Sequence, residues 1–151
     1  LEAKLTTVTP AAVHAASAQE LQALGMSLRK AEYIKDFADK IVSGEFDLQA
    51  VEEMSDAEAI TALSSLKGIG KWTAEMILLF CLQRPDILSY DDLAIQRGLR
   101  MLYHHRKITR ELFKKYQKRY SPYGSTAAIY LWAIAGGAIE GMKDYAPAKK
   151  R

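Results

Sequence analysis

The nine residues from Leu66 to Ala74, LKGIGKWTA, constrain the fold of this chain more than any other stretch. They join a capped amphipathic segment, which begins at Ser55, to an almost wholly apolar segment over residues 76–80. Both flanking segments are typical of helices, and the second helix is expected to start at Lys71. Two helices joined by so short a link are expected to fold back on each other as a hairpin.

The two glycines of this link suit it to bind an anion. Gly68 and Gly70 have no Cβ, so we expect both to take positive φ and to expose their backbone N–H groups. The positive end of the second helix dipole lies beside them, and a phosphate is the usual ligand of such a turn. The commoner alternative for a G-x-G link is a plain helix cap and chain reversal.

Helix start signals recur along the rest of the chain, and no segment alternates polar and apolar residues as a strand does. We therefore predict an all-α fold. The expected capping residues are Thr9, Ser17, Ser27, Asp47, Ser55, Asp91-Asp92 and Thr109, and Ser125 is expected to start the last helix, over residues 126–138.

Length and composition suit one compact domain, or two small lobes that share a core. The chain has 151 residues, of which 49% are hydrophobic. We expect a single helical domain over residues 1–141, with the hairpin at 55–82, followed by a polar and poorly ordered tail at 142–151. The chain opens on Leu1 rather than methionine, so we expect an N-terminally incomplete fragment or a processed product.

Charge is distributed unevenly along the chain, although the formal net charge is only +3. Residues 45–58 hold six acids and no base, whereas residues 97–119 hold nine lysines or arginines and one acid, Glu111. The basic stretch predicts an electropositive face that could bind a polyanion. An ordinary solvated helix surface is the alternative reading.

Cysteine usage and hydropathy indicate a reducing, non-membrane setting. Cys81, the single cysteine, lies in an apolar run and is expected to be buried, and the chain holds no cysteine cluster for an iron–sulfur centre. The apolar runs are too short to span a bilayer, and there is no signal-peptide pattern. We expect a cytoplasmic protein.

The next candidate for chemistry is the tandem Asp91-Asp92, although most aspartates before a helix only cap it. The order of elements adds information: a hairpin, an apolar helix, a loop, then an acid that opens a helix reading DLAIQRG. Together with the LKGIGKWTA turn, this order resembles the helix-hairpin-helix (HhH-GPD) DNA glycosylases, over residues 55–137. Within them the chain is similar to the bacterial 3-methyladenine DNA glycosylase II (AlkA-type) family. The resemblance implies the compact multi-helix glycosylase fold, here lacking its N-terminal helices.

The resemblance implies that Asp92, and not Asp91, is the catalytic acid. Cleavage of a base–sugar bond builds positive charge on the sugar, which a carboxylate in a water-poor site can stabilise while it orients or deprotonates the attacking water. An alkylated purine is already cationic and leaves with little acid help, so one carboxylate suffices. Ser89 and Tyr90 stand where the family tends to have proline and valine, so we expect a less rigid loop before Asp92.

Trp72 occupies the position at which glycosylase/lyase members of the superfamily carry the lysine that attacks the sugar. Lys71 lies one residue earlier and would point elsewhere on the helix. An indole offers stacking rather than nucleophilicity, which suits an electron-poor flipped base, although a core tryptophan is the structural alternative. The resemblance places Trp72, Met76 and Tyr123 around the base pocket.

The resemblance also assigns DNA contacts to the hairpin and implies a monovalent cation there, Na⁺ or K⁺, but no required cofactor. The expected DNA-binding residues are Lys67, Gly68, Gly70, Lys71 and Thr73, and the expected cation ligands are the backbone carbonyls of Ser64, Leu66 and Ile69. The expected partner is double-stranded DNA that contains alkylated bases. The chain is expected to act as a monomer, or to be completed by a missing N-terminal segment.

These observations favour a monofunctional DNA glycosylase that excises alkylated bases, such as 3-methyladenine, by hydrolysis in base excision repair. A non-catalytic helix-hairpin-helix module that only binds DNA is one alternative, and a bifunctional glycosylase/AP lyase is another. The acid at Asp92 distinguishes the enzyme from the binding module, and Trp72 disfavours the lyase.

Overall fold

The computed structural model describes residues 8–147, and every regular element in that range is an α-helix. The all-α prediction is therefore confirmed for the described residues. The chain divides into two compact units, an N-terminal unit that ends at Ala74 and a C-terminal unit that begins at Glu75. No helix in the described range is both long and apolar enough to cross a membrane.

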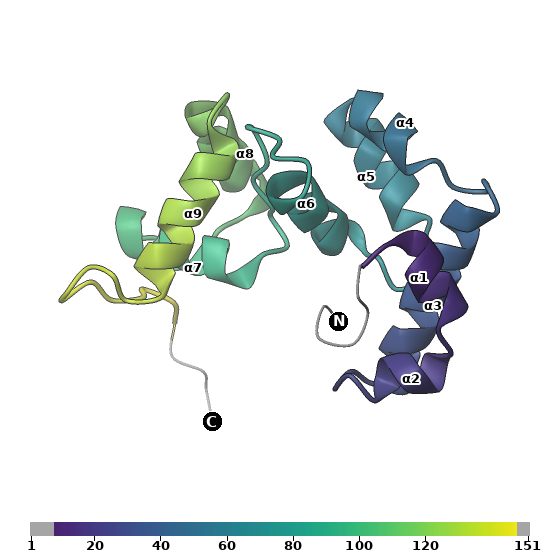
Figure 1. Cartoon of the computed structure of the whole chain (residues 1–151). Helices are drawn as coiled ribbons and strands as arrows, with labels where there is room; N and C mark the ends of the chain where they lie inside the picture. Colours follow the sequence, from purple (N-terminus) through teal and green to yellow (C-terminus); the bar gives the residue numbers. More distant parts are fainter. Residues whose placement is uncertain (1–7, 148–151) are drawn as a thin grey trace. The chain divides into compact units, whose positions relative to one another are not determined.

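The N-terminal unit consists of short helices whose starts are encoded locally. The helices are α1 (Pro10–Ala15), α2 (Ala18–Gln22), α3 (Leu28–Val42), α4 (Leu48–Glu53) and α5 (Asp56–Ser64). Ser17 and Ser55 each form a complete capping box with the glutamate three residues later, as the sequence predicts. Helices α1 and α2 pack on α3, and α4 lies beside α5 (Figure 1).

Burial within this unit follows the apolar stripes of its helices. A small core cluster joins Val13 of α1, Leu21 of α2 and two alanines of α3, Ala31 and Ala38. Alanine at these α3 positions leaves little space between the helix axes, so short helices can pack closely against it. This packing holds α3 in place, and α3 supports the hairpin turn described below.

The C-terminal unit contains most of α6 (Lys71–Phe80), followed by α7 (Leu93–Tyr103), α8 (Arg110–Tyr120) and α9 (Gly124–Ala135). Helices α7 and α9 make the main helix pair of the unit (Figure 1). A Cβ built on Gly98 of α7 would lie 2.4 Å from the backbone oxygen of Leu131 on α9. Glycine is required at this position because the two backbones approach so closely.

Helix α9 begins at Gly124, two residues before the predicted start. The reason is a carboxylate from a distant loop: Asp86 Oδ1 accepts the Gly124 N–H at 3.0 Å. Ser125, which the sequence suggests as the cap, instead accepts the Ile87 N–H through its hydroxyl at 3.0 Å. A cap supplied 38 residues away leaves no local signal in the sequence.

Two further expectations differ from the structure. Cys81, which directly follows α6, is exposed rather than buried. The first part of the polar tail is held in place, since Arg100 binds both carboxylate oxygens of Asp144 at 2.7 and 2.6 Å. The Arg100 guanidinium holds the pKa of Asp144 below its ordinary value. Residues 148–151 of the tail lie outside the described range.

Candidate functional site

The hairpin turn belongs to the N-terminal unit and connects α5 to α6. The Leu66 carbonyl accepts the Ile69 N–H at 3.2 Å, which closes the turn, and the Gly70 carbonyl accepts the Ala74 N–H at 2.9 Å as the first bond of α6. Gly68 has φ +81°, as predicted. The expectation of positive φ at Gly70 is wrong, because Gly70 directly precedes α6 and is not among the glycines with positive φ.

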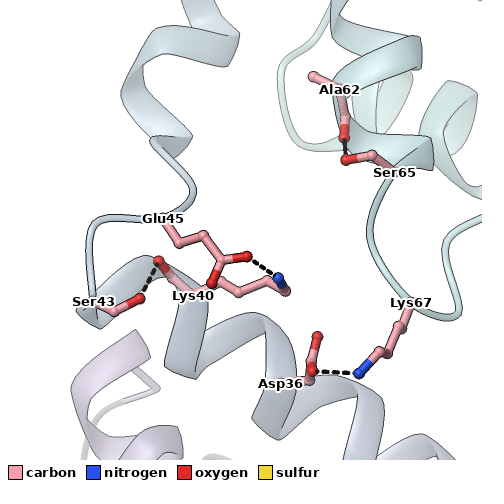
Figure 2. Close-up of polar contacts among 7 residues, drawn as sticks. All are labelled: Asp36, Lys40, Ser43, Glu45, Ala62, Ser65 and Lys67. Carbon is pink, nitrogen blue, oxygen red and sulfur yellow. Dashed lines mark hydrogen bonds and ion pairs between the residues drawn. The ribbon is translucent and has the colours of Figure 1, made fainter.

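Helix α3 supports this turn through two side chains that sequence reasoning did not identify. The ring of Tyr33 packs against Gly68 so closely that a Cβ there would lie 2.1 Å from Tyr33 Cδ2. One turn further along α3, Asp36 accepts a hydrogen bond from Lys67 Nζ at 3.0 Å (Figure 2). Tyr33 and Asp36 share a face of α3 because they are three residues apart, but nothing in that spacing indicates which turn they contact.

The remaining predicted site residues of the hairpin lie on the first turns of α6. The side chain of Trp72 is 47% exposed, so it is not a core tryptophan. Lys71 is exposed, and Thr73 is half-buried. Met76, four residues after Trp72 on the same helix, is also half-buried.

Asp91 and Asp92 differ in burial and in partners, although they are adjacent. Asp92 is only 6% exposed and caps α7, because its Oδ1 accepts the N–H groups of Ala94 at 2.8 Å and Ile95 at 2.9 Å. Asp91 is 43% exposed and lies 3.7 Å from the Arg110 guanidinium. Asp92, the acid to which the family resemblance assigns the catalytic role, is thus the buried one of the two.

The loop before Asp92 is fastened by side chains rather than by a proline. Ser89 is fully buried, and its hydroxyl donates a hydrogen bond to the carboxylate of Glu75, itself only 7% exposed. Gln96 Nε2 donates to the Tyr90 carbonyl at 2.7 Å. The Tyr90 ring packs edge-on against Phe113 and lies under the Arg110 guanidinium, 4.3 Å from ring centroid to Cζ.

These contacts predict that Ser89→Ala destabilises the C-terminal unit. The substitution removes a hydrogen bond from a buried carboxylate, which costs about 1–3 kcal/mol of unfolding free energy. Urea denaturation followed by circular dichroism measures this loss. Ser43→Ala is the matched control, because the exposed Ser43 hydroxyl donates only to the Lys40 carbonyl at 3.2 Å (Figure 2). Equal stability of the two variants would show that the Ser89–Glu75 contact contributes nothing.

Tyr123 lies on a cavity of the C-terminal unit whose lining does not include Asp92. The cavity has a volume of about 410 Å³ and is lined by Leu102, Tyr103, Arg119, Tyr120, Tyr123, Thr126, Ala127, Tyr130, Leu131 and Ile134. The Tyr103 and Tyr120 hydroxyls are 2.9 Å apart, and burial together with this contact raises the pKa of Tyr120. Tyr123 itself is 69% exposed at the edge of this aromatic surface.

The residues for which the family resemblance implies a monovalent cation lie at the end of α5 and in the turn that follows. Ser64 is the last residue of α5, where the helix dipole is negative, and Leu66 and Ile69 lie in the turn between α5 and α6. The Ser64 hydroxyl is buried and has no hydrogen-bond partner. Neutral oxygens at a negative helix end suit a monovalent cation. Among residues 8–147 no group of three or more His, Cys, Asp or Glu side chains could hold a metal ion.

Comparison with proteins of known structure finds the same architecture. A crystal structure of DNA-3-methyladenine glycosidase from Bacillus halodurans superposes with a TM-score of 0.77 at 35% identity, over 91% of this chain and 64% of that one. The 3-methyladenine DNA glycosylase of Schizosaccharomyces pombe, in complex with abasic DNA, gives a TM-score of 0.76 at 32% identity, over 90% and 66% of the two chains.

Sequence comparison agrees with the structural one. DNA-3-methyladenine glycosylase 1 of Schizosaccharomyces pombe is 36% identical over 126 residues, which cover 82% of this chain and 55% of the relative. The chain therefore spans about half the length of this relative. The family described as "HhH-GPD superfamily base excision DNA repair protein" matches residues 1–122. The chain thus belongs to the HhH-GPD superfamily of base excision DNA repair proteins.

Proposed function

We propose that this chain is a monofunctional DNA glycosylase that excises alkylated bases such as 3-methyladenine by hydrolysing the N-glycosidic bond. The observation that carries the proposal is the buried carboxylate of Asp92 at the start of α7. The lesion class is supported by the similarity to the Bacillus halodurans and Schizosaccharomyces pombe proteins, which are 3-methyladenine glycosylases.

In the proposed reaction, Asp92 acts on the sugar rather than on the base. As the bond to the base breaks, positive charge develops on the sugar ring, and a buried carboxylate stabilises it more strongly than one in water. The same carboxylate orients the water that attacks the sugar carbon and accepts its proton. The departing electron pair neutralises the cationic alkylated base, so no second acid is needed.

The hairpin is proposed to hold the DNA backbone. The N–H groups of Gly68 and Gly70 would bind a phosphate oxygen, and Lys67, Lys71 and Thr73 would lie beside it. A monovalent cation held by the carbonyls of Ser64, Leu66 and Ile69 would add positive charge for the same phosphate. The place of Ser64 at the C-terminal end of α5 and its buried hydroxyl, which has no hydrogen-bond partner, support that assignment.

Aromatic side chains are proposed to receive the flipped base. Trp72 is half-exposed, which suits a stacking surface better than a structural core, and Met76 lies one turn later on α6. Tyr123 is proposed as a third member, because its exposed ring lies at the edge of an aromatic cavity. The enzyme is proposed to act as a cytoplasmic monomer without a required cofactor, and an exposed free thiol at Cys81 suits that reducing compartment.

The product distinguishes this proposal from the bifunctional alternative. A duplex with one alkylated base should lose the base but keep an intact abasic strand, which breaks only after treatment with hot alkali. Borohydride added during the reaction should trap no protein–DNA adduct, since Trp72 stands at the position of the lyase lysine. An adduct that maps to Lys71 would show that the bifunctional reading is correct. An unchanged lesion strand would favour the binding module.

A further inference from the structure

The side chain of Lys67, at the hairpin turn, is already engaged by an acid. Its Nζ lies 3.0 Å from Asp36 Oδ1 (Figure 2). The lysine side chain is 68% exposed and that of the aspartate is 28% exposed, so solvent and solutes can reach the pair. Any phosphate that binds Lys67 must compete with this carboxylate.

Asp36 is held beside the turn by the packing of its own helix. Tyr33, one turn earlier on α3, fills the space against Gly68, so that α3 and the turn are in direct contact. Lys40, one turn later, has an acid of its own in Glu45, with which it forms an ion pair (Figure 2). The Asp36 carboxylate thus lies beside the turn, next to Lys67.

An acid beside a phosphate-binding turn acts against DNA because it neutralises a cation that would otherwise contact phosphate. Contacts between lysine and phosphate add affinity for DNA of any sequence and release counterions, so they also set the salt dependence of binding. An acid that forms an ion pair with the lysine lowers both the affinity for DNA and the salt dependence of binding.

We propose that Asp36 competes with DNA phosphate for Lys67 and thereby limits how tightly the hairpin holds duplex DNA of any sequence. This inference rests on the proposed function, because it takes the hairpin as a DNA contact. It differs from the simpler view that an ion pair only braces the turn. If the ion pair braces the turn, removal of the Asp36 carboxylate should weaken DNA binding. If Asp36 competes with phosphate, its removal should tighten DNA binding.

The test is a titration of undamaged duplex DNA at several salt concentrations. Asp36→Asn should tighten binding by about two- to fivefold, the range that a surface ion pair spans. It should also steepen the dependence of log K on log salt by about 0.9, as one more phosphate contact requires. Lys67→Met removes the cation for which Asp36 and phosphate compete, so it provides the background in which this competition cannot occur.

The control is Asp39→Asn, which removes the same charge from the same helix. Asp39 pairs with His14 at 2.7 Å and with Lys35 at 3.5 Å rather than with the turn. Its effect should be clearly smaller than that of Asp36→Asn. In the Lys67→Met background the effect of Asp36→Asn should fall to that of the control, which is the signature of direct coupling between the two residues.

Three outcomes would overturn the inference. Weaker binding by Asp36→Asn would support bracing. If Asp36→Asn and Asp39→Asn tighten DNA binding equally, the effect is one of general charge. The same conclusion follows if Asp36→Asn still tightens DNA binding in the Lys67→Met background. Each of these leaves the proposed function intact, since the parent still binds DNA. A parent chain with no affinity for duplex DNA would instead remove the proposed function and this inference together.

Discussion

Asp92→Asn is expected to abolish base excision, with a loss of at least about 10²- to 10³-fold in the rate of base release. The amide is similar in size to the carboxylate but carries no charge to stabilise the cation that develops on the sugar. Base release from a methylated duplex under single-turnover conditions measures this rate.

The fold and DNA binding should survive this change. Asparagine is as good a helix cap as aspartate, and its carbonyl oxygen can accept the same two N–H groups that Asp92 Oδ1 accepts at the start of α7. Asp91→Asn is the matched control, because that side chain is exposed and pairs only loosely with Arg110 at 3.7 Å. It should retain most of the activity. Parent-like activity of Asp92→Asn would remove Asp92 from the chemistry.

Gly68→Ala is expected to damage both stability and DNA binding. Alanine at φ +81° is strained, and its Cβ would lie 2.1 Å from a Tyr33 ring atom and 2.8 Å from two others. The two effects together should lower the free energy of unfolding by about 2–4 kcal/mol. Urea denaturation measures the stability, and titration with duplex DNA of the fraction that remains folded measures the affinity.

Gly70→Ala separates the two effects. A Cβ on Gly70 meets nothing within 4 Å, and φ there is not positive, so the variant should fold with parent-like stability. If the turn binds phosphate through its backbone N–H groups, the added methyl blocks close approach and the affinity should still fall. It should fall more than in Lys67→Ala, whose cation Asp36 already engages. Parent-like DNA binding by a folded Gly70→Ala would contradict the hairpin assignment.

The sequence predicts those parts of the fold that depend on neighbouring residues. The capping boxes at Ser17 and Ser55 and the caps at Asp92 and Thr109 all act within three residues, and each helix begins where its cap indicates. The turn glycine at Gly68 is likewise a local requirement. The superfamily is also recognisable from short motifs, because the turn and the acid lie in a fixed order along the chain.

Features that depend on distant residues were not predictable in this way. Helix α9 starts early because of Asp86, and the Asp92 loop is held by Glu75 through Ser89. Helix α3 supports the hairpin through residues that are distant in sequence: Asp36 and Lys67 are 31 positions apart. A single sequence shows which residues can form hydrogen bonds but not which of them meet after folding. The single domain over residues 1–141 stays a prediction.

Release of free methylated base is the most direct measure of glycosylase activity in this chain. Duplex DNA treated with a methylating agent is incubated with the full chain, the DNA is precipitated, and the soluble bases are separated by chromatography. We expect 3-methyladenine to appear in proportion to time and enzyme, and Asp92→Asn to release no more than buffer alone. A folded chain that binds this DNA but releases no methylated base above the buffer level would contradict the proposed function.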